Sequence, residues 1–191
     1  MKKLIHLLTL SVFNILACNS QNPIVVITTD FGDIELEIFS DKAPATANHF
    51  MQNIDKGIFK DASFYRVVRK DNQPNNDVKI EVIQGGLFHD SIVDNMPRIR
   101  HETTIETGIL HKNGVISMAR MEPGSASTEI FICIGNQPEL DFGGKRNPDG
   151  QGFAAFGIVT NGMNVVKKIQ QQKDKDQMLI EHIKIINIKQ K

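Results

Sequence analysis

Short apolar runs rich in β-branched residues recur along this chain, and turn-forming glycine, proline, asparagine or aspartate separates one run from the next. Residues 24–29 read Ile-Val-Val-Ile-Thr-Thr, and after the turn residues 30–33 the segment 34–39 alternates apolar and charged side chains. This pair predicts an antiparallel hairpin with one buried face. By the same criteria, further strands are expected at 63–68, 80–84, 114–119, 129–134, 153–159 and 179–188.

Two segments have helical spacing instead. Pro44 is tolerated in the first turn of a helix, and the apolar residues that follow it keep helical spacing until Gly57, which is placed to end the helix. A second helix is expected over 163–171. Many short strands with two helices predict a β-barrel or a β-sandwich, and periodicity leaves that choice open. No repeat or second linker interrupts 24–191, so we predict a single domain there.

The first residues have the pattern of an export signal. A basic start is followed by the apolar run 4–16, which is shorter than the roughly 20 apolar residues of a transmembrane helix. The following Ile-Leu-Ala-Cys, which ends at Cys18, resembles a bacterial lipobox. We therefore expect a signal peptide at 1–17, lipid on Cys18, a tether at 18–23, and a membrane-anchored protein in the bacterial cell envelope that faces the periplasm. The alternative is an ordinary signal peptide with an incidental cysteine.

The charge balance bears on possible binding partners, and the cysteine content bears on disulfide bonds. The 22 basic and 22 acidic residues balance, and without residues 1–17 the formal charge is −2. That balance gives no electrostatic case for nucleic acid, which requires a clustered basic face. Cys133 is the single cysteine besides Cys18, so a lipidated chain forms no internal disulfide and depends on its core. About 165 residues suffice for one core, and we expect a monomer.

Four segments in a fixed order carry a family resemblance. They are Phe64-Tyr65-Arg66-Val67-Val68, Gln84-Gly85-Gly86, Gly114-Val115-Ile116-Ser117-Met118-Ala119 and Glu129-Ile130-Phe131-Ile132. This order resembles the cyclophilin family of peptidyl-prolyl cis–trans isomerases, whose pattern reads roughly F-H-R-[VI]-[VI], Q-G-G, G-x-[LIV]-S-M-A and Q-F-F-I. The resemblance covers about 24–188. It implies a mainly β fold, namely a closed eight-stranded antiparallel barrel capped by two α-helices, and an isomerase that needs no cofactor.

Rotation of an X–Pro bond faces a barrier of roughly 18–20 kcal/mol that comes from amide resonance, so no covalent step is needed. An apolar slot for the proline ring and a fixed donor for the twisted amide are enough. Arginine suits the donor role, because it stays charged and offers rigid N–H groups. The resemblance assigns catalysis to Arg66. It assigns substrate binding to Gln84, Val82, Ala119, Arg120, Glu129, Phe131, Leu140 and Phe153.

Strand alternation adds to these assignments. On 129–134 it places Glu129, Phe131 and Cys133 on one face and the three isoleucines on the other, which fits a barrel interior. On 63–68 it predicts that Phe64 and Val68 share the face of Arg66. The plainer alternatives are a solvated surface role for Arg66 and ordinary core positions for the phenylalanines.

The chain also departs from the family pattern. Glu139 stands where the family often has tryptophan, Glu129 where it often has glutamine, and Glu81 where an aromatic residue is common, so we expect a more acidic rim. We therefore expect inhibition by cyclosporin, a ligand of the family, to be weak. The segment 143–152 is rich in glycine but matches neither a P-loop nor a dinucleotide motif, and we predict an inserted loop beside the pocket. The histidines lack zinc-site spacing, so no metal is expected.

The function predicted from these features is isomerisation of X–Pro bonds in proline-containing polypeptides that are unfolded or extended in the periplasm. The alternative is a related module that binds such peptides as a chaperone or scaffold with little turnover. Retention of Arg66 favours the enzyme, because a pure binder needs only the apolar slot.

Overall fold

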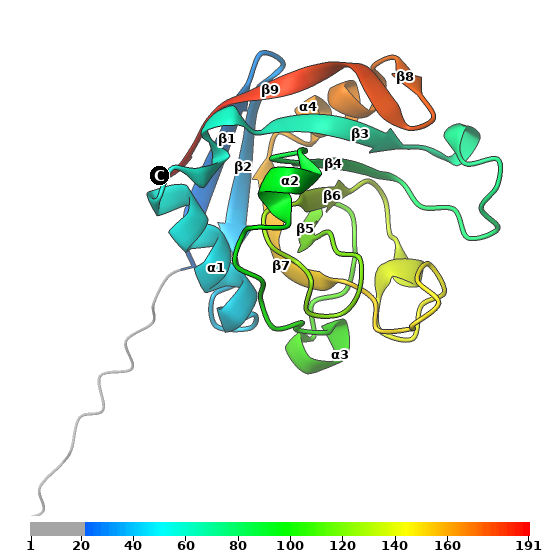
Figure 1. Cartoon of the computed structure of the whole chain (residues 1–191), viewed down its shortest axis with the longest axis horizontal. Helices are drawn as coiled ribbons and strands as arrows, with labels where there is room; N and C mark the ends of the chain where they lie inside the picture. The colour runs from blue at the N-terminus through cyan, green and yellow to red at the C-terminus, as the bar shows by residue number, and fades with distance from the viewer. Residues whose placement is uncertain (1–21) are drawn as a thin grey trace, which may run out of the picture.

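The computed structural model describes residues 22–191, which form a closed antiparallel barrel (Figure 1). Eight strands follow one another round the ring in the order β1-β2-β7-β5-β6-β4-β3-β9, and β9 pairs with β1 to close it. The prediction of an eight-stranded barrel is therefore confirmed, and the sandwich is excluded. The strands are β1 (Ile24–Thr29), β2 (Gly32–Ile38), β3 (Ser63–Val68), β4 (Val82–Gly86), β5 (Val115–Met118), β6 (Ile130–Cys133), β7 (Ala154–Asn161) and β9 (Met178–Gln190), with a short β8 (Asp174–Lys175) that pairs with the start of β9.

Two longer helices lie on opposite sides of the barrel in Figure 1, α1 (Pro44–Asp55) and α4 (Met163–Gln170). Both send apolar side chains into the main core, for example Phe50 from α1 and Val166 from α4. The structure adds two single-turn helices that the sequence did not predict, α2 (Asp90–Val93) and α3 (Thr104–Thr107). Three short 3₁₀ turns complete the elements, at Ile58–Asp61, Lys70–Asn72 and Pro138–Leu140.

The alternation predicted for β6 is confirmed. Ile130 and Ile132 are buried in the barrel core, whereas Phe131 and Cys133 belong to a second apolar cluster on the outside of the same strands. That outer cluster also contains Val82 from β4. Because adjacent side chains of a strand point to opposite faces, one strand serves both the core and a surface site.

The face predicted for Phe64 is wrong. The pairing of β3 with β4 matches Phe64 to Gly85 and Arg66 to Gln84, so Tyr65 is an extra residue in a β-bulge. Phe64 is fully buried in the main core, while the next two side chains both take part in hydrogen bonds on the outer face. The bulge therefore presents Tyr65 and Arg66 together.

The described part of the chain begins inside the predicted tether. The amide of Ile38 donates to the carbonyl oxygen of Pro23 at 2.9 Å, and the Asn22 side chain donates to Glu37 at 2.8 Å. The predicted signal peptide and Cys18 lie outside the described residues. Over 22–191, none of the helices combines the length and apolar character that crossing a membrane requires.

Candidate active site

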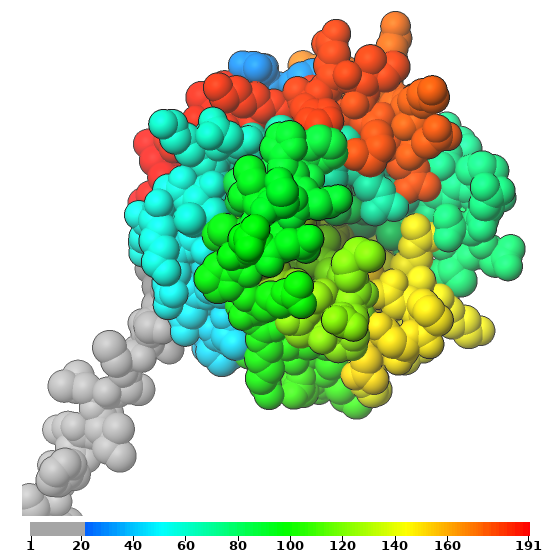
Figure 2. All heavy atoms as spheres, in the orientation of Figure 1, coloured from blue at the N-terminus to red at the C-terminus, as the bar shows by residue number. Residues whose placement is uncertain are grey.

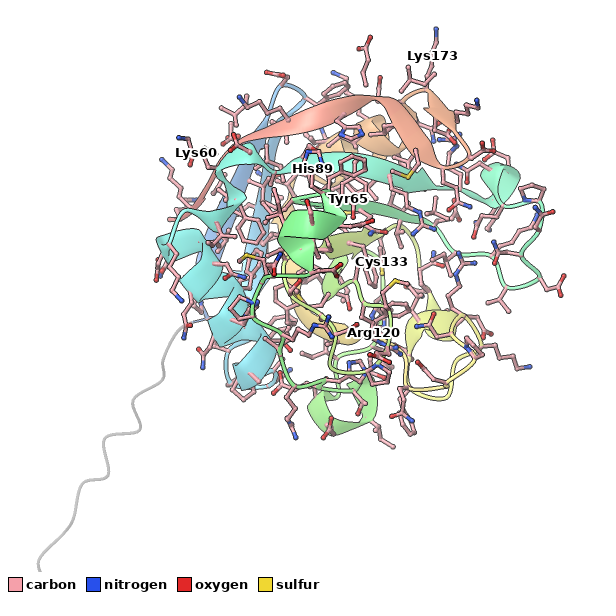
Figure 3. The ribbon with its side chains drawn as sticks, viewed as in Figure 1. Lys60, Tyr65, His89, Arg120, Cys133 and Lys173 are labelled. Carbon is pink, nitrogen blue, oxygen red and sulfur yellow. The ribbon has the colours of Figure 1, made fainter. Side chains whose placement is uncertain are left out.

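A cavity of about 260 Å³ with an apolar slot on one side opens on the outer face of β3, β4, β5 and β6. It is lined by eight of the nine residues predicted from the sequence, namely Arg66, Val82, Gln84, Ala119, Arg120, Phe131, Leu140 and Phe153. The ninth, Glu129, lines a neighbouring cavity of about 270 Å³, which shares Gln84, Ala119, Arg120 and Met121 with the first. In Figure 3, Tyr65 and Arg120 are seen on this face, with Cys133 between them in the view.

Two aromatic rings shape the slot. The Phe131 and Phe153 rings meet edge to face with their centroids 5.3 Å apart. Behind Phe131 the ring of His111 stacks in parallel at 5.8 Å. His111 is itself held between the Asp141 carboxylate, 2.7 Å from Nδ1, and the Ser117 hydroxyl, 3.0 Å from Nε2. Sequence reasoning gave His111 no such role.

The Asp141–His111–Ser117 line has the order of a hydrolytic triad, but Ser117 is fully buried in β5. No substrate atom could reach its hydroxyl without opening the barrel wall. The line therefore supports Phe131 from behind.

Arg66 is held by two glutamines. Its Nη1 donates to Gln84 Oε1 at 2.9 Å, and its Nε and Nη2 donate to Gln177 Oε1 at 3.1 and 2.6 Å. Gln177 lies in the turn between β8 and β9, at a positive φ of 72°. Among residues 22–191 no carboxylate forms an ion pair with Arg66, and burial lowers the pKa of its guanidinium. Two of its five N–H groups have no partner among those residues, so they are available to a substrate.

A chain of hydrogen bonds leads away from Arg66. Gln84 Nε2 donates to the Tyr65 oxygen at 2.7 Å, and the Tyr65 hydroxyl donates to Glu129 Oε2. The other carboxylate oxygen, Oε1, accepts from the amide of Leu87 at 2.7 Å. Burial and the charge of Glu129 raise the pKa of Tyr65, so the hydroxyl keeps its proton. Glu129 thus orients Gln84 through Tyr65. The sequence analysis gave Tyr65 no role, although this tyrosine stands where the family pattern has histidine.

The two glycines after Gln84 make this packing possible. A Cβ on Gly85 would lie 2.8 Å from the ring of Phe64 and 2.7 Å from the carbonyl oxygen of Ser63. Gly86 has a φ of 151°, and a Cβ there would overlap the Glu129 carboxylate. The close approaches of Phe64 and Glu129 therefore both require glycine.

Arg120 is held by its own partners in the wall of the cavity. It lines the cavity, but its guanidinium donates to Asp149 at 2.7 and 2.9 Å and to the carbonyl oxygen of Gly152 at 2.8 and 2.5 Å. It also covers the Phe153 ring at 5.2 Å. The hydrogen bonds from Arg120 lower the pKa of Asp149 to about 2. Arg120 therefore fixes the Phe153 wall instead of offering free donors.

Two of the three acids expected at the rim turn away from the slot cavity. Glu139 turns its carboxylate to the backbone amide of Lys145 at 2.9 Å, and Glu81 faces Lys70 at 3.5 Å. Neither lines the slot cavity, which has no carboxylate among its lining residues. The acids lie in the neighbouring cavity, which is lined by Asp90, Asp94, Glu122 and Glu129.

The inserted loop predicted at 143–152 does lie beside the pocket, and it contributes Arg146 and Asn147 to the lining. In Figure 2 this loop, in yellow, and the segment around residue 120, in yellow-green, are neighbours on the face that is shown. Over 22–191, no group of three or more His, Cys, Asp or Glu side chains is placed to hold a metal ion.

Comparison with known proteins bears directly on this arrangement. The family described as "Cyclophilin type peptidyl-prolyl cis-trans isomerase/CLD" matches residues 24–190. The chain belongs to the cyclophilin family. It is 30% identical over 147 residues to peptidyl-prolyl cis–trans isomerase B of Escherichia coli K12, a match that covers 76% of this chain and 83% of that protein.

Solved cyclophilins share the fold. A cyclophilin-type isomerase of Cryptosporidium parvum superposes with a TM-score of 0.69 at 20% identity, over 89% of this chain and 98% of that one. A second structure of the parasite protein, obtained in the presence of the dipeptide Ala-Pro, gives a TM-score of 0.66 at 21% identity, over 86% of this chain and 96% of that one. The chain is thus a cyclophilin-type peptidyl-prolyl cis–trans isomerase, and the apolar slot beside Arg66 is its candidate active site.

Proposed function

We propose that this cyclophilin assists the folding of exported proteins by accelerating X–Pro rotation, and that lipid on Cys18 anchors it in the bacterial cell envelope facing the periplasm. The observation that supports the catalytic part is the guanidinium of Arg66, fixed by Gln84 and Gln177 beside an apolar slot. A module that only bound proline would not need this fixed donor.

The mechanism follows from the loss of amide resonance. The proline ring enters the slot formed by Val82, Phe131, Leu140 and Phe153, while the preceding carbonyl rotates. As the bond twists, the nitrogen regains its lone pair and becomes a better hydrogen-bond acceptor. The free N–H groups of Arg66 donate to that lone pair. Little reorganisation is needed, because the hydrogen bonds to the two glutamines already hold the guanidinium in place.

Proline-containing polypeptides are the expected partners. The parasite relative whose structure was obtained in the presence of Ala-Pro supports a slot of this kind for an X–Pro unit. The test is isomerisation of a proline peptide by the purified chain, measured with protease coupling. Peptide binding without acceleration would favour the chaperone or scaffold alternative.

The membrane part of the proposal rests on the lipobox-like residues that end at Cys18 and on the apolar run before it. In a Gram-negative host, the full-length chain should partition with membranes and incorporate labelled palmitate. Cys18→Ser should abolish labelling, because serine offers no thiol to the lipid transfer. Unlabelled wild-type protein found soluble in the periplasm would restore the ordinary signal peptide. The substituted variant should still isomerise, since Cys18 precedes the barrel.

A further inference from the structure

Arg146 is held rigidly at the edge of the proline slot. Its Nη1 donates to the carbonyl oxygen of Val78 at 2.7 Å and to Gln73 Oε1 at 3.1 Å. Gln73 is fully buried, and it also bonds both backbone groups of Ile80. Two loops distant in sequence thus meet at Arg146. Among residues 22–191 its Nε and Nη2 groups have no hydrogen-bond partner, which leaves three N–H donors free next to the cavity.

The slot cavity is strongly cationic. Three of its lining residues are arginines and none is an acid. Arg120 is neutralised by Asp149, but within the described chain neither Arg66 nor Arg146 has a carboxylate partner. The burial of Arg146 and the charge of Arg66 lower the pKa of Arg146, although an arginine stays charged at neutral pH. Two like charges that share a partly desolvated pocket repel, and an anion placed beside them relieves that cost.

The positive charge is confined to the slot cavity. Residues 22–191 carry 20 basic and 22 acidic side chains, so the chain as a whole weakly repels anions. The adjoining cavity is lined by four acids and two arginines, and it shares Gln84, Ala119, Arg120 and Met121 with the slot. The groove is therefore positive at the Arg146 end and negative at the α2 end. An anionic side chain of a bound peptide has one favourable place in it.

We propose that Arg146, together with Arg66, forms an anion subsite next to the proline slot, and that the enzyme prefers X–Pro peptides with an aspartate or glutamate close to the proline. The planar guanidinium of Arg146 offers the paired donors that a carboxylate accepts. The inference rests on the proposed function, because the proline must occupy the slot for the acid to reach Arg146.

The experiment compares capped peptides with no terminal charges. Each contains Ala-Pro, with glutamate, glutamine or lysine either two residues before the proline or directly after it. NMR exchange with the purified full-length chain gives kcat/KM for each. At low salt, one of the two placements should favour glutamate over glutamine by about five- to tenfold, and 0.5 M salt should reduce that ratio. In Arg146→Gln the ratio should fall to about one, whatever the absolute rates.

Two further variants separate recognition from loop structure. Lys145→Gln removes a charge from an exposed neighbour in the same loop and should keep the ratio. Arg146→Lys keeps the positive charge but lacks the paired donors of the guanidinium, and it should give an intermediate glutamate-to-glutamine ratio. If glutamate is not preferred in wild type at either position, or if the preference survives Arg146→Gln, the subsite does not exist. Failure to isomerise even the glutamine peptides would instead contradict the proposed function.

Discussion

Replacing Glu129 by glutamine tests whether the direction of the hydrogen bonds that lead to Arg66 matters. An ionised carboxylate can only accept. Tyr65 therefore donates to Glu129, Gln84 donates its amide to the Tyr65 oxygen, and the Gln84 carbonyl remains free to accept from Arg66. The amide of Leu87 occupies the other carboxylate oxygen. The Glu129 carboxylate, which can only accept, therefore sets the direction of every hydrogen bond in this series.

Glutamine cannot reproduce this pattern, because it has one acceptor and two donors. If its oxygen accepts from Leu87, its amide faces Tyr65, and then either the hydroxyl loses its acceptor or Gln84 turns its own amide toward Arg66. If its oxygen faces Tyr65, two donors meet at Leu87. Each arrangement loses a hydrogen bond of a charged group, worth about 1.5–3 kcal/mol.

That free energy should appear in one of two measurements. If Gln84 turns, the loss falls on the position of Arg66, and kcat/KM drops by about ten- to 150-fold, since about 1.4 kcal/mol is a factor of ten. If Gln84 stays, the loss falls on folding and lowers the melting temperature by about 3–12 °C. Protease-coupled kinetics and calorimetry on the same Glu129→Gln preparation distinguish the two.

Two further variants test the reasoning. Glu122→Gln removes an equal charge from the same neighbouring cavity and should change neither measurement, since its exposed side chain takes no part in the chain of bonds. Tyr65→His combined with Glu129→Gln restores the pair typical of the family pattern, and a ring with one donor and one acceptor should recover part of the loss. Unchanged kinetics and unchanged melting in Glu129→Gln would refute the argument.

Three other predictions follow from the same site. Arg66→Ala should lower kcat/KM about ten- to a thousandfold, the loss typical of one preorganised donor, with little change in melting; an unfolded or fully active variant would contradict its role. Phe131→Ala should cost about 3–5 kcal/mol of stability and weaken peptide binding, because the ring is 4% exposed and forms the slot; normal kinetics in a stable variant would remove it from the slot. Asp149 has its pKa lowered to about 2, so its ion pair with Arg120 contributes fully above about pH 4 and is lost as the pH falls toward 2. An NMR titration that places this pKa near 4 would show that Arg120 does not hold Asp149.

Much of the barrel could be predicted from the sequence, because side chains alternate along each strand between the barrel core and the outer face. In β6 the period-two pattern separated Ile130 and Ile132 from Phe131, and the structure places them as expected. Closure could not be predicted in this way, because the pairing of β1 with β9 joins Val25 to Gln190 across nearly the whole chain. Only the family resemblance supplied it.

Contacts between loops could not be predicted from the sequence either. Arg146 lies in the site because its guanidinium bonds Gln73 and Val78, which are 73 and 68 residues away. No local pattern encodes such a meeting. The same holds for Gln177, whose oxygen holds Arg66 from a turn 111 residues distant. The residues that line the slot were predictable, whereas the parts that Gln177 and Tyr65 play in orienting Arg66 were not.

The bulge in β3 explains why strand alternation failed at the most important position. In a regular strand, Arg66 on the outer face would bring Phe64 out with it and turn Tyr65 inward, which would expose an apolar ring and bury a hydroxyl at a cost of about 1–3 kcal/mol without a partner. The extra residue removes that conflict, because Phe64 stays in the core while Tyr65 reaches both Gln84 and Glu129. Gly85 then leaves the space that the Phe64 ring needs. The order Phe-Tyr-Arg therefore fits this site only together with the bulge, and the irregularity of the strand is part of how Arg66 is positioned.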